Sequence, residues 1–336
     1  MTSANRRQFA GISLAAIASL GVKDVWGQSA SPETTPNGEW SFTDLEGTTV
    51  TLPKTPTRIA ANIVTAAALW DLGIKCVAVF DYAVSAYPDG DHIAWGNIDP
   101  AEVINVADAD GNILAEELIV ADVDIVFTQS FALGDPSQTL GVPAEVAETL
   151  EQIAPILIVS DFSSTDVQLD QLVTLATALG ADFSAPDVVA LQEAYEAKVE
   201  ELRTTISKQA DIRALFLAAY PDELYAFGPG GVPDLMFLGS LGMNFANADS
   251  AAANDFLESL SPEQATLYPT DVLFMDVYGS LQTAEDLAGE PAYAAIPAVQ
   301  ANQVGLWERD FPASYAGVTH FMDTILATLQ SATPLT

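Results

Sequence analysis

Short apolar runs alternate with longer mixed segments along most of this chain. In the first half, the runs with the composition of buried strands are 58–64, 76–82, 123–129 and 156–160. Between them lie segments whose apolar residues recur at helical spacing, at 66–72, 115–121 and 144–153. Strands that alternate with helices are typical of βα units around a largely parallel sheet. The pattern therefore predicts an N-terminal α/β lobe in residues 40–183.

The second half repeats this rhythm with different lengths. Its strand-like runs are 213–220, 223–228, 272–277 and 303–307, and an apolar-periodic segment at 312–329 closes the chain as a helix. These elements predict a second, C-terminal α/β lobe in residues 209–336.

A long amphipathic segment at 184–208 separates the two lobes. Apolar residues recur in it at intervals of three or four, at Val188, Leu191, Tyr195, Val199, Leu202 and Ile206. Pro186 stands where a first helical residue loses nothing by lacking an N–H. At about 1.5 Å per residue such a helix is roughly 30 Å long, enough to run along both lobes. We therefore expect two α/β lobes joined by a single rigid helix, with small rocking motions and a ligand cleft between them.

The N-terminus has the pattern of a twin-arginine export signal. Arg6 and Arg7 precede an uncharged apolar run, 9–22, that is too short to span a membrane. A buried amphipathic helix with two incidental arginines is the alternative. The only cysteine, Cys76, lies far past this run, so no lipid-accepting cysteine follows it. We expect residues 1–27 to direct export to the periplasm or cell-surface space and residues 28–39 to be a linker.

The charge balance excludes several classes of protein. The chain has 46 Asp+Glu against 11 Lys+Arg, for a net charge of −35, yet 49% of its residues are hydrophobic. Such apolar content argues against disorder, and the negative charge argues against nucleic acid as a partner. Two histidines and one cysteine cannot form a three-histidine or thiolate metal site. We expect a folded, acidic monomer that holds no metal directly.

Four segments together resemble one protein family. Residues 40–53, WSFTDLEGTTVTLP, lead into Pro56-Thr57-Arg58-Ile59-Ala60, and the resemblance continues at 67–75, 112–126 and 291–304. The order and spacing are similar to the class III substrate-binding proteins of ATP-binding-cassette (ABC) importers, which take up ferric siderophores, cobalamin or haem. Val123 stands where the family usually has proline.

This resemblance implies a binding protein rather than an enzyme, without a cofactor, in which iron enters only as part of a bound chelate. It also implies that Glu116 and Glu263, one on each lobe, dock on arginines of the membrane permease. Both could instead be ordinary solvated charges, and Glu263 also follows Ser261 where an acid would cap a helix.

The ligand is expected on loops at the strand ends of both lobes. The candidates in the first lobe are Tyr82, Tyr87, Trp95, Gln129 and Phe131, and those in the second are Tyr220, Tyr225, Phe227, Trp307, Arg309 and Tyr315. Aromatic faces suit a bulky chelate, although each aromatic residue could also belong to a core. Arg309 could contact ligand oxygens or pair with Glu308 or Asp310. His92 could ligate haem, or be solvated or bonded to a carboxylate.

We therefore predict an exported receptor that delivers a ferric siderophore to an ABC permease. The net negative charge favours a neutral or cationic ferric hydroxamate over an anionic triscatecholate, although the acidity could also be an adaptation to a saline habitat. Cobalamin and haem remain alternatives within the family. A secreted α/β hydrolase is disfavoured because the nucleophile motif G-x-S-x-G is missing.

Overall fold

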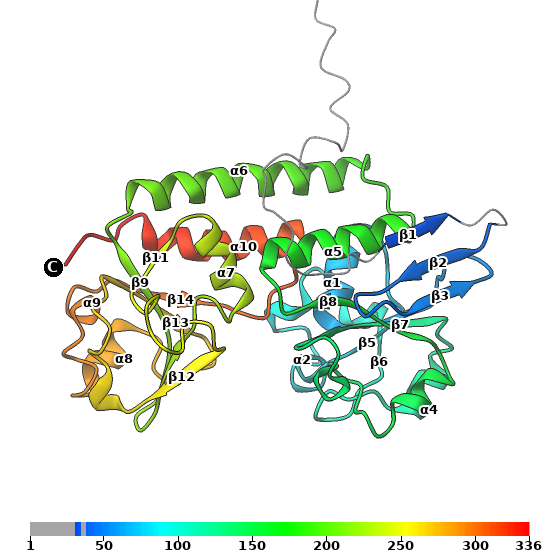
Figure 1. Ribbon diagram of the computed structural model, residues 1–336, viewed down its shortest axis with the longest axis horizontal. Helices are drawn as coiled ribbons and strands as arrows, with labels where there is room; N and C mark the ends of the chain where they lie inside the picture. Colours follow the sequence, from blue (N-terminus) through cyan, green and yellow to red (C-terminus); the bar gives the residue numbers. More distant parts are fainter. Residues whose placement is uncertain (1–30, 35–37, 336) are drawn as a thin grey trace, which may run out of the picture.

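The structure, a computed structural model, describes residues 31–34 and 38–335. The expected export segment, 1–27, lies outside the described residues. The prediction of a linker at 28–39 is wrong in part, because Ser31–Thr34 forms strand β1, which pairs antiparallel with β2 (Trp40–Thr43). With β3 (Thr49–Leu52) these strands make a small three-stranded sheet at one end of the molecule (Figure 1).

The first lobe is built on a five-stranded sheet in the order β6-β5-β4-β7-β8, and every neighbouring pair is parallel. The strands are β4 (Ile59–Asn62), β5 (Ala78–Phe80), β6 (Ile104–Asn105), β7 (Ile125–Ser130) and β8 (Ile156–Asp161). The first strand in sequence, β4, lies in the middle, so the chain winds outward from it in both directions. Its carboxyl end is therefore a topological switch point, where ligands of open α/β sheets bind.

Alternate residues of these strands face two different layers. Ile59 and Ala61 pack with α1 (Ile63–Asp71) and α5 (Thr165–Ala178), whereas Ala60 packs toward α3 (Ala115–Val120) and α4 (Ala147–Glu151). The lobe is completed by α2 (Tyr82–Ala86) and three short 3₁₀ helices, η1 (Ile93–Trp95), η2 (Pro100–Glu102) and η3 (Pro136–Gln138). Apolar residues on both faces of the strands explain why their sequences read as continuous apolar runs.

The second lobe has a mixed sheet in the order β12-β10-β9-β13-β14, with β11 beside β9. Its strands are β9 (Arg213–Ala219), β10 (Leu224–Phe227), β11 (Asn244–Phe245), β12 (Leu257–Leu260), β13 (Val272–Asp276) and β14 (Val304–Trp307). β13 runs parallel to β9 and β14, whereas β10 is antiparallel to its neighbours. One face packs on α7 (Pro233–Ser240) and α10 (Tyr315–Leu329). The other packs on α8 (Ala284–Gly289) and α9 (Pro297–Gln300), near η4 (Pro262–Gln264).

Helix α6 (Pro186–Lys208) joins the lobes, with Pro186 in its first turn. Val188 near its start is buried in the core of the first lobe, and Leu202 and Ile206 are buried in the core of the second. Tyr195, between them, packs against both cores. Figure 1 shows α6 running along both lobes, beside α10 for part of its length. The expected architecture of two α/β lobes joined by one long helix is confirmed.

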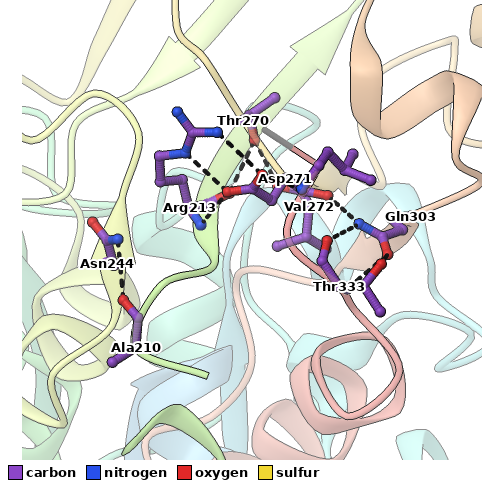
Figure 2. A network of polar contacts seen from close by, with 9 residues as sticks. Ala210, Arg213, Asn244, Thr270, Asp271, Val272, Gln303 and Thr333 are labelled. Carbon is purple, nitrogen blue, oxygen red and sulfur yellow. Dashed lines mark hydrogen bonds and ion pairs between the residues drawn. The ribbon is translucent and has the colours of Figure 1, made fainter. Parts of the chain in front are cut away.

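A polar network fastens the end of the chain to the start of the strands in the second lobe (Figure 2). The Asp271 carboxylate, just before β13, accepts a hydrogen bond from the Arg213 Nε at 2.9 Å. It also accepts one from the Leu335 backbone N–H at 2.9 Å. Gln303 donates to the Asp271 carbonyl oxygen at 2.6 Å and accepts from the Thr333 N–H at 2.7 Å. The network lies at the amino ends of the strands, opposite the edge where the switch-point rule places a ligand site.

Candidate ligand-binding cleft

A cavity of about 670 Å³ lies between the two lobes. The first lobe contributes residues that follow the carboxyl ends of β4, β5, β7 and β8, and the second contributes the start of α7 and the loops after β13 and β14. This placement agrees with the expected cleft and with the switch point at β4. The volume is in the range of small-molecule sites.

Aromatic rings from both lobes line this cavity: Tyr82, Phe131, Phe162, Phe256, Tyr278 and Phe311. The rings of Phe131 and Phe162 meet edge to face with their centroids 5.2 Å apart, and Phe162 approaches Phe256 across the lobes at 5.8 Å. Tyr82 is 55% exposed and Phe131 is 46% exposed. Large aromatic side chains that stay exposed around a cavity indicate a surface for a partly apolar ligand.

Arg309 is the single Lys or Arg among the described residues that line the cavity. Its Nε donates to Asp276 Oδ2 at 3.0 Å, its Nη1 lies 3.5 Å from Asp310 Oδ1, and its guanidinium lies 4.5 Å from the centroid of the Tyr278 ring. The expected pairing with Asp310 is therefore present, but the closer partner is Asp276. Glu308, the other expected partner, contacts His320 instead.

Carboxylates outnumber this one cation. Asp81, Asp234 and Asp310 all line the cavity. Burial raises the pKa of Asp81 to about 6, and the negative charge of Asp310 adds to the rise. Burial also raises the pKa of Asp234 to about 6, although the hydrogen bond that Asp234 accepts from Trp307 Nε1 at 2.6 Å opposes the shift. At neutral pH the cavity therefore carries an excess of negative charge.

One hydrogen bond at the cleft ties the lobes directly. His92 Nε2 lies 2.6 Å from the Tyr278 hydroxyl, and His92 Nδ1 accepts from the Ala94 N–H at 3.2 Å. The His92 ring also stacks on Tyr87 with centroids 4.7 Å apart. Burial lowers the pKa of His92, which favours the neutral ring. Because protein groups engage both ring nitrogens, this arrangement does not present His92 as a haem ligand.

The residues expected to bind ligand divide into several groups. Tyr82, Gln129, Phe131 and Arg309 line the cavity. Tyr87 lies behind His92, beside a neighbouring hollow.

Trp95, Phe227 and Trp307 lie in the cores instead, with exposed fractions of 3%, 3% and 0%. Trp95 sits in η1, which packs against α1, and the rings of Phe227 and Trp307 meet edge to face at 4.7 Å in the core of the second lobe. The prediction that these three residues contact the ligand is therefore wrong, because each ring fills a core and does not face the cavity.

Tyr220, Tyr225 and Tyr315 also do not line the cavity. The Tyr220 hydroxyl donates to the Tyr278 carbonyl oxygen at 2.9 Å and so supports the loop that carries Tyr278. Tyr225 donates to Glu223, and Tyr315 packs on Tyr195 of α6 with ring centroids 5.5 Å apart. These three tyrosines therefore contact other protein residues and do not face the cavity.

Several residues of the cavity were not expected from the sequence. Three of them lie at or just after the ends of the predicted strands 76–82, 156–160 and 272–277, namely Asp81, Phe162 and Tyr278. Their position at strand ends is the sequence signal that indicates a place in the cleft. Asp234 lies in the first turn of α7, which does not follow directly on a strand end. Phe256 comes from a loop segment and has no comparable sequence pattern.

The two glutamates expected to dock on a permease are both exposed. Glu116 lies in the first turn of α3 and Glu263 in η4. Both elements are on the sides of their sheets that face away from α6. The capping box at η4 involves Gln264, whose Oε1 accepts from the Ser261 N–H at 3.0 Å. Glu263 also has a local role in this turn, because hydrogen bonds from its own backbone N–H and from the Ser261 side chain lower the pKa of its carboxyl group.

Across residues 31–34 and 38–335, no helix is both long and apolar enough to cross a membrane. The same residues contain no cluster of three or more His, Cys, Asp or Glu side chains that could hold a metal ion.

Comparison with known proteins identifies the family. Residues 90–310, more than half of the chain, match the family described as "Periplasmic binding protein". Among solved structures, DesE, a ferric-siderophore receptor protein from Streptomyces coelicolor, is 29% identical, with a TM-score of 0.75, and the match covers 88% of this chain and 100% of DesE. No curated protein sequence matches the chain.

Two more distant structures share the fold. The siderophore-binding protein FhuD from Vibrio cholerae, with Fe³⁺-Desferal bound, is 17% identical, with a TM-score of 0.61 and coverage of 83% of this chain and 99% of FhuD. The petrobactin-binding protein YclQ from Bacillus subtilis is 14% identical, with a TM-score of 0.64 and coverage of 87% and 99%.

The chain therefore belongs to the periplasmic binding protein family, and the resemblance to its class III members is confirmed. Members of this family are extracytoplasmic solute-binding proteins rather than enzymes.

Proposed function

We propose that this protein captures a ferric siderophore and delivers it to the permease of an ABC importer. The observation that carries the proposal is the 670 Å³ cavity between the lobes, with aromatic walls from both sides and one arginine. Such walls match a compact chelate that exposes apolar linkers and a few oxygens. The ferric-siderophore receptor DesE, at 29% identity over its full length, supports the same ligand class.

Within that class we infer a neutral or cationic ferric hydroxamate. Among the residues that the structure describes, three carboxyl groups, Asp81, Asp234 and Asp310, line the cavity beside a single Lys or Arg side chain, Arg309. A triscatecholate chelate, with its high negative charge, would be repelled by such a site, whereas a neutral or positive chelate would not. The negative charge of the whole chain acts in the same direction.

The delivery step rests on the outer surface of the lobes. Glu116 and Glu263 are exposed, one on each lobe, and both lie away from α6. Two charged contacts on separate lobes would fix the orientation of docking and still release easily. The protein would act as a monomer outside the cytoplasm, after export by the twin-arginine route, and would contribute no cofactor and no metal ligand of its own.

Ligand titrations test this function. Intrinsic tryptophan fluorescence is the readout, because Trp307 Nε1 bonds to Asp234, which lines the cavity. We expect a ferric trihydroxamate to bind with micromolar or better affinity, and at least about tenfold more tightly than a ferric triscatecholate, a difference of about 1.4 kcal/mol. Tighter binding of cobalamin or haem than of any ferric chelate would overturn the proposal.

A further inference from the structure

The first turn of α1 forms part of the cavity wall at the switch point of the first sheet. Ile63, Val64 and Thr65 line the cavity, and α1 follows directly on β4. The first N–H groups of an α-helix have no partner within the helix. Asn62 is the N-cap residue, and its side chain makes no capping hydrogen bond. The donors of this turn are therefore not satisfied by a cap.

Two polar side chains of the turn are buried without a partner. Asn62 and Thr65 are each 0% exposed. Within the described part of the chain, neither the amide atoms of Asn62 nor Thr65 Oγ1 has a hydrogen-bond partner. They occupy the N-cap and third helical positions, whose side chains lie close together in a helical first turn. Buried polar groups of this kind destabilise a fold unless another group bonds to them, so a partner from outside the chain is indicated.

The electrostatics of this turn differ from those of the rest of the cavity. Helices α5 and α7 also begin at the cavity, but they carry Asp166 and Asp234 in their first turns. The first turn of α1 contains no acidic residue. The positive end of the α1 dipole is therefore not neutralised by its own sequence, and the turn is rich in donors inside an acidic cavity.

We propose that the first turn of α1 is a ligand subsite in which the Thr65 hydroxyl and the first N–H groups of the helix bind a carbonyl oxygen of the chelate. This inference rests on the proposed function and adds the orientation of the ligand. Amide or hydroxamate carbonyl oxygens face α1, and any positively charged part of the chelate faces Asp81 and Asp310.

Isosteric substitution of Thr65 tests the subsite. In Thr65→Val a methyl group replaces a hydroxyl that has no partner in the protein, so the urea midpoint should stay the same or rise. The dissociation constant of a ferric trihydroxamate should increase about tenfold. Thr65→Ser keeps the hydroxyl and should bind within about twofold of wild type. Thr174→Val is the matched control, because Thr174 lies on the exposed surface of α5 and should change neither quantity greatly.

The outcomes separate the subsite from the function. If wild type binds the trihydroxamate and Thr65→Val binds it equally well, the subsite is wrong and the function stands. If Thr65→Ser loses as much affinity as Thr65→Val, packing of the methyl group is responsible and the subsite is again wrong. If wild type binds no ferric chelate, the proposed function fails and the subsite fails with it.

Discussion

Arg309 lies at the centre of a compact group of charges and rings, held by Asp276, Asp310 and Tyr278. Asp276 is almost fully buried, with 2% of its side chain exposed. Burial raises the pKa of Asp276, and the charge of Arg309 opposes that rise. The arginine therefore has two tasks, since it compensates a buried carboxylate and presents donors to the cavity.

Replacing Arg309 separates these tasks. Arg309→Gln should lower the free energy of unfolding by about 1–3 kcal/mol, because Asp276 loses its charged partner, and should weaken binding of a ferric hydroxamate about tenfold or more. The double variant Arg309→Gln/Asp276→Asn should recover stability but not affinity, as measured by urea unfolding and titration. Arg203→Gln, on the exposed side of α6, is the control. Unchanged affinity in Arg309→Gln would limit the arginine to a structural role.

Asp81 predicts a dependence on pH. Its pKa is about 6, so the carboxyl group becomes neutral as the pH falls from 7 to 5. A cationic ferric chelate should bind more weakly over this range, whereas a neutral chelate should change little. Asp81→Asn should bind the cationic chelate more weakly at pH 7 and show a smaller pH dependence, of which Asp234, whose pKa is also about 6, retains a part. An equal pH dependence for both chelates would contradict this assignment.

The same carboxyl group affects stability in the opposite direction. Its folded pKa lies above the value of 3.8 expected without the fold, so the folded state binds the proton more tightly than the unfolded state. Its contribution to stability is present in full below about pH 4 and is lost as the pH rises through about 6.

At the scale of secondary-structure elements, α6 determines how the lobes are held. Its two ends are buried in different cores, and Tyr195 in the middle contacts both. A continuous helix of 23 residues resists bending more than an extended linker would. Motion between the lobes is therefore expected to be small.

A break in α6 should disturb both stability and binding. Ala197 is exposed in the middle of the helix. Ala197→Pro should cost about 3 kcal/mol or more in unfolding free energy, and the resulting kink should misalign the two walls of the cavity and reduce affinity. Ala197→Gly, which costs about 1 kcal/mol without forcing a kink, is the control and should bind almost as wild type. Calorimetry and titration measure both effects, and normal affinity in Ala197→Pro would show that α6 does not align the lobes.

For the whole molecule, the structure has the lobes in contact at the cleft. The His92–Tyr278 hydrogen bond and the Phe162–Phe256 ring contact both connect the first lobe to the second. The cavity thus depends on both lobes, and neither lobe alone presents its full wall. The surface that we propose for handover lies elsewhere, on the sides of the sheets away from α6.

Charge reversal tests the handover. Glu116→Arg combined with Glu263→Arg should abolish uptake through the permease while leaving chelate affinity within about twofold, since both residues are exposed and outside the cavity. Glu117→Arg, one residue along the same exposed turn, is the matched control and should still support uptake. The assays are chelate titration and uptake of iron-55 by cells that carry the importer. Normal uptake by the double variant would exclude the two glutamates from docking.

The sequence alone determined the layout of the molecule. Continuous apolar runs mark strands that are buried on both faces, and the period of Val188 to Ile206 marks the long helix, because both patterns follow from local geometry. The family also followed from the sequence, since the order of its motifs reflects the order of elements along the chain. Tyr82, Gln129, Phe131 and Arg309 could be predicted because they lie at or just after strand ends.

Only the tertiary structure decided which side chains meet in the cleft. Trp307 and Phe227 also stand at strand ends, but their rings face the helices, and no local pattern distinguishes them from Tyr278 or Phe162. The charge of the cavity likewise depends on Asp81, Asp234 and Asp310, which come from distant segments and are brought together by packing of the lobes. Contacts between segments far apart in sequence depend on packing in three dimensions, which composition and periodicity do not specify.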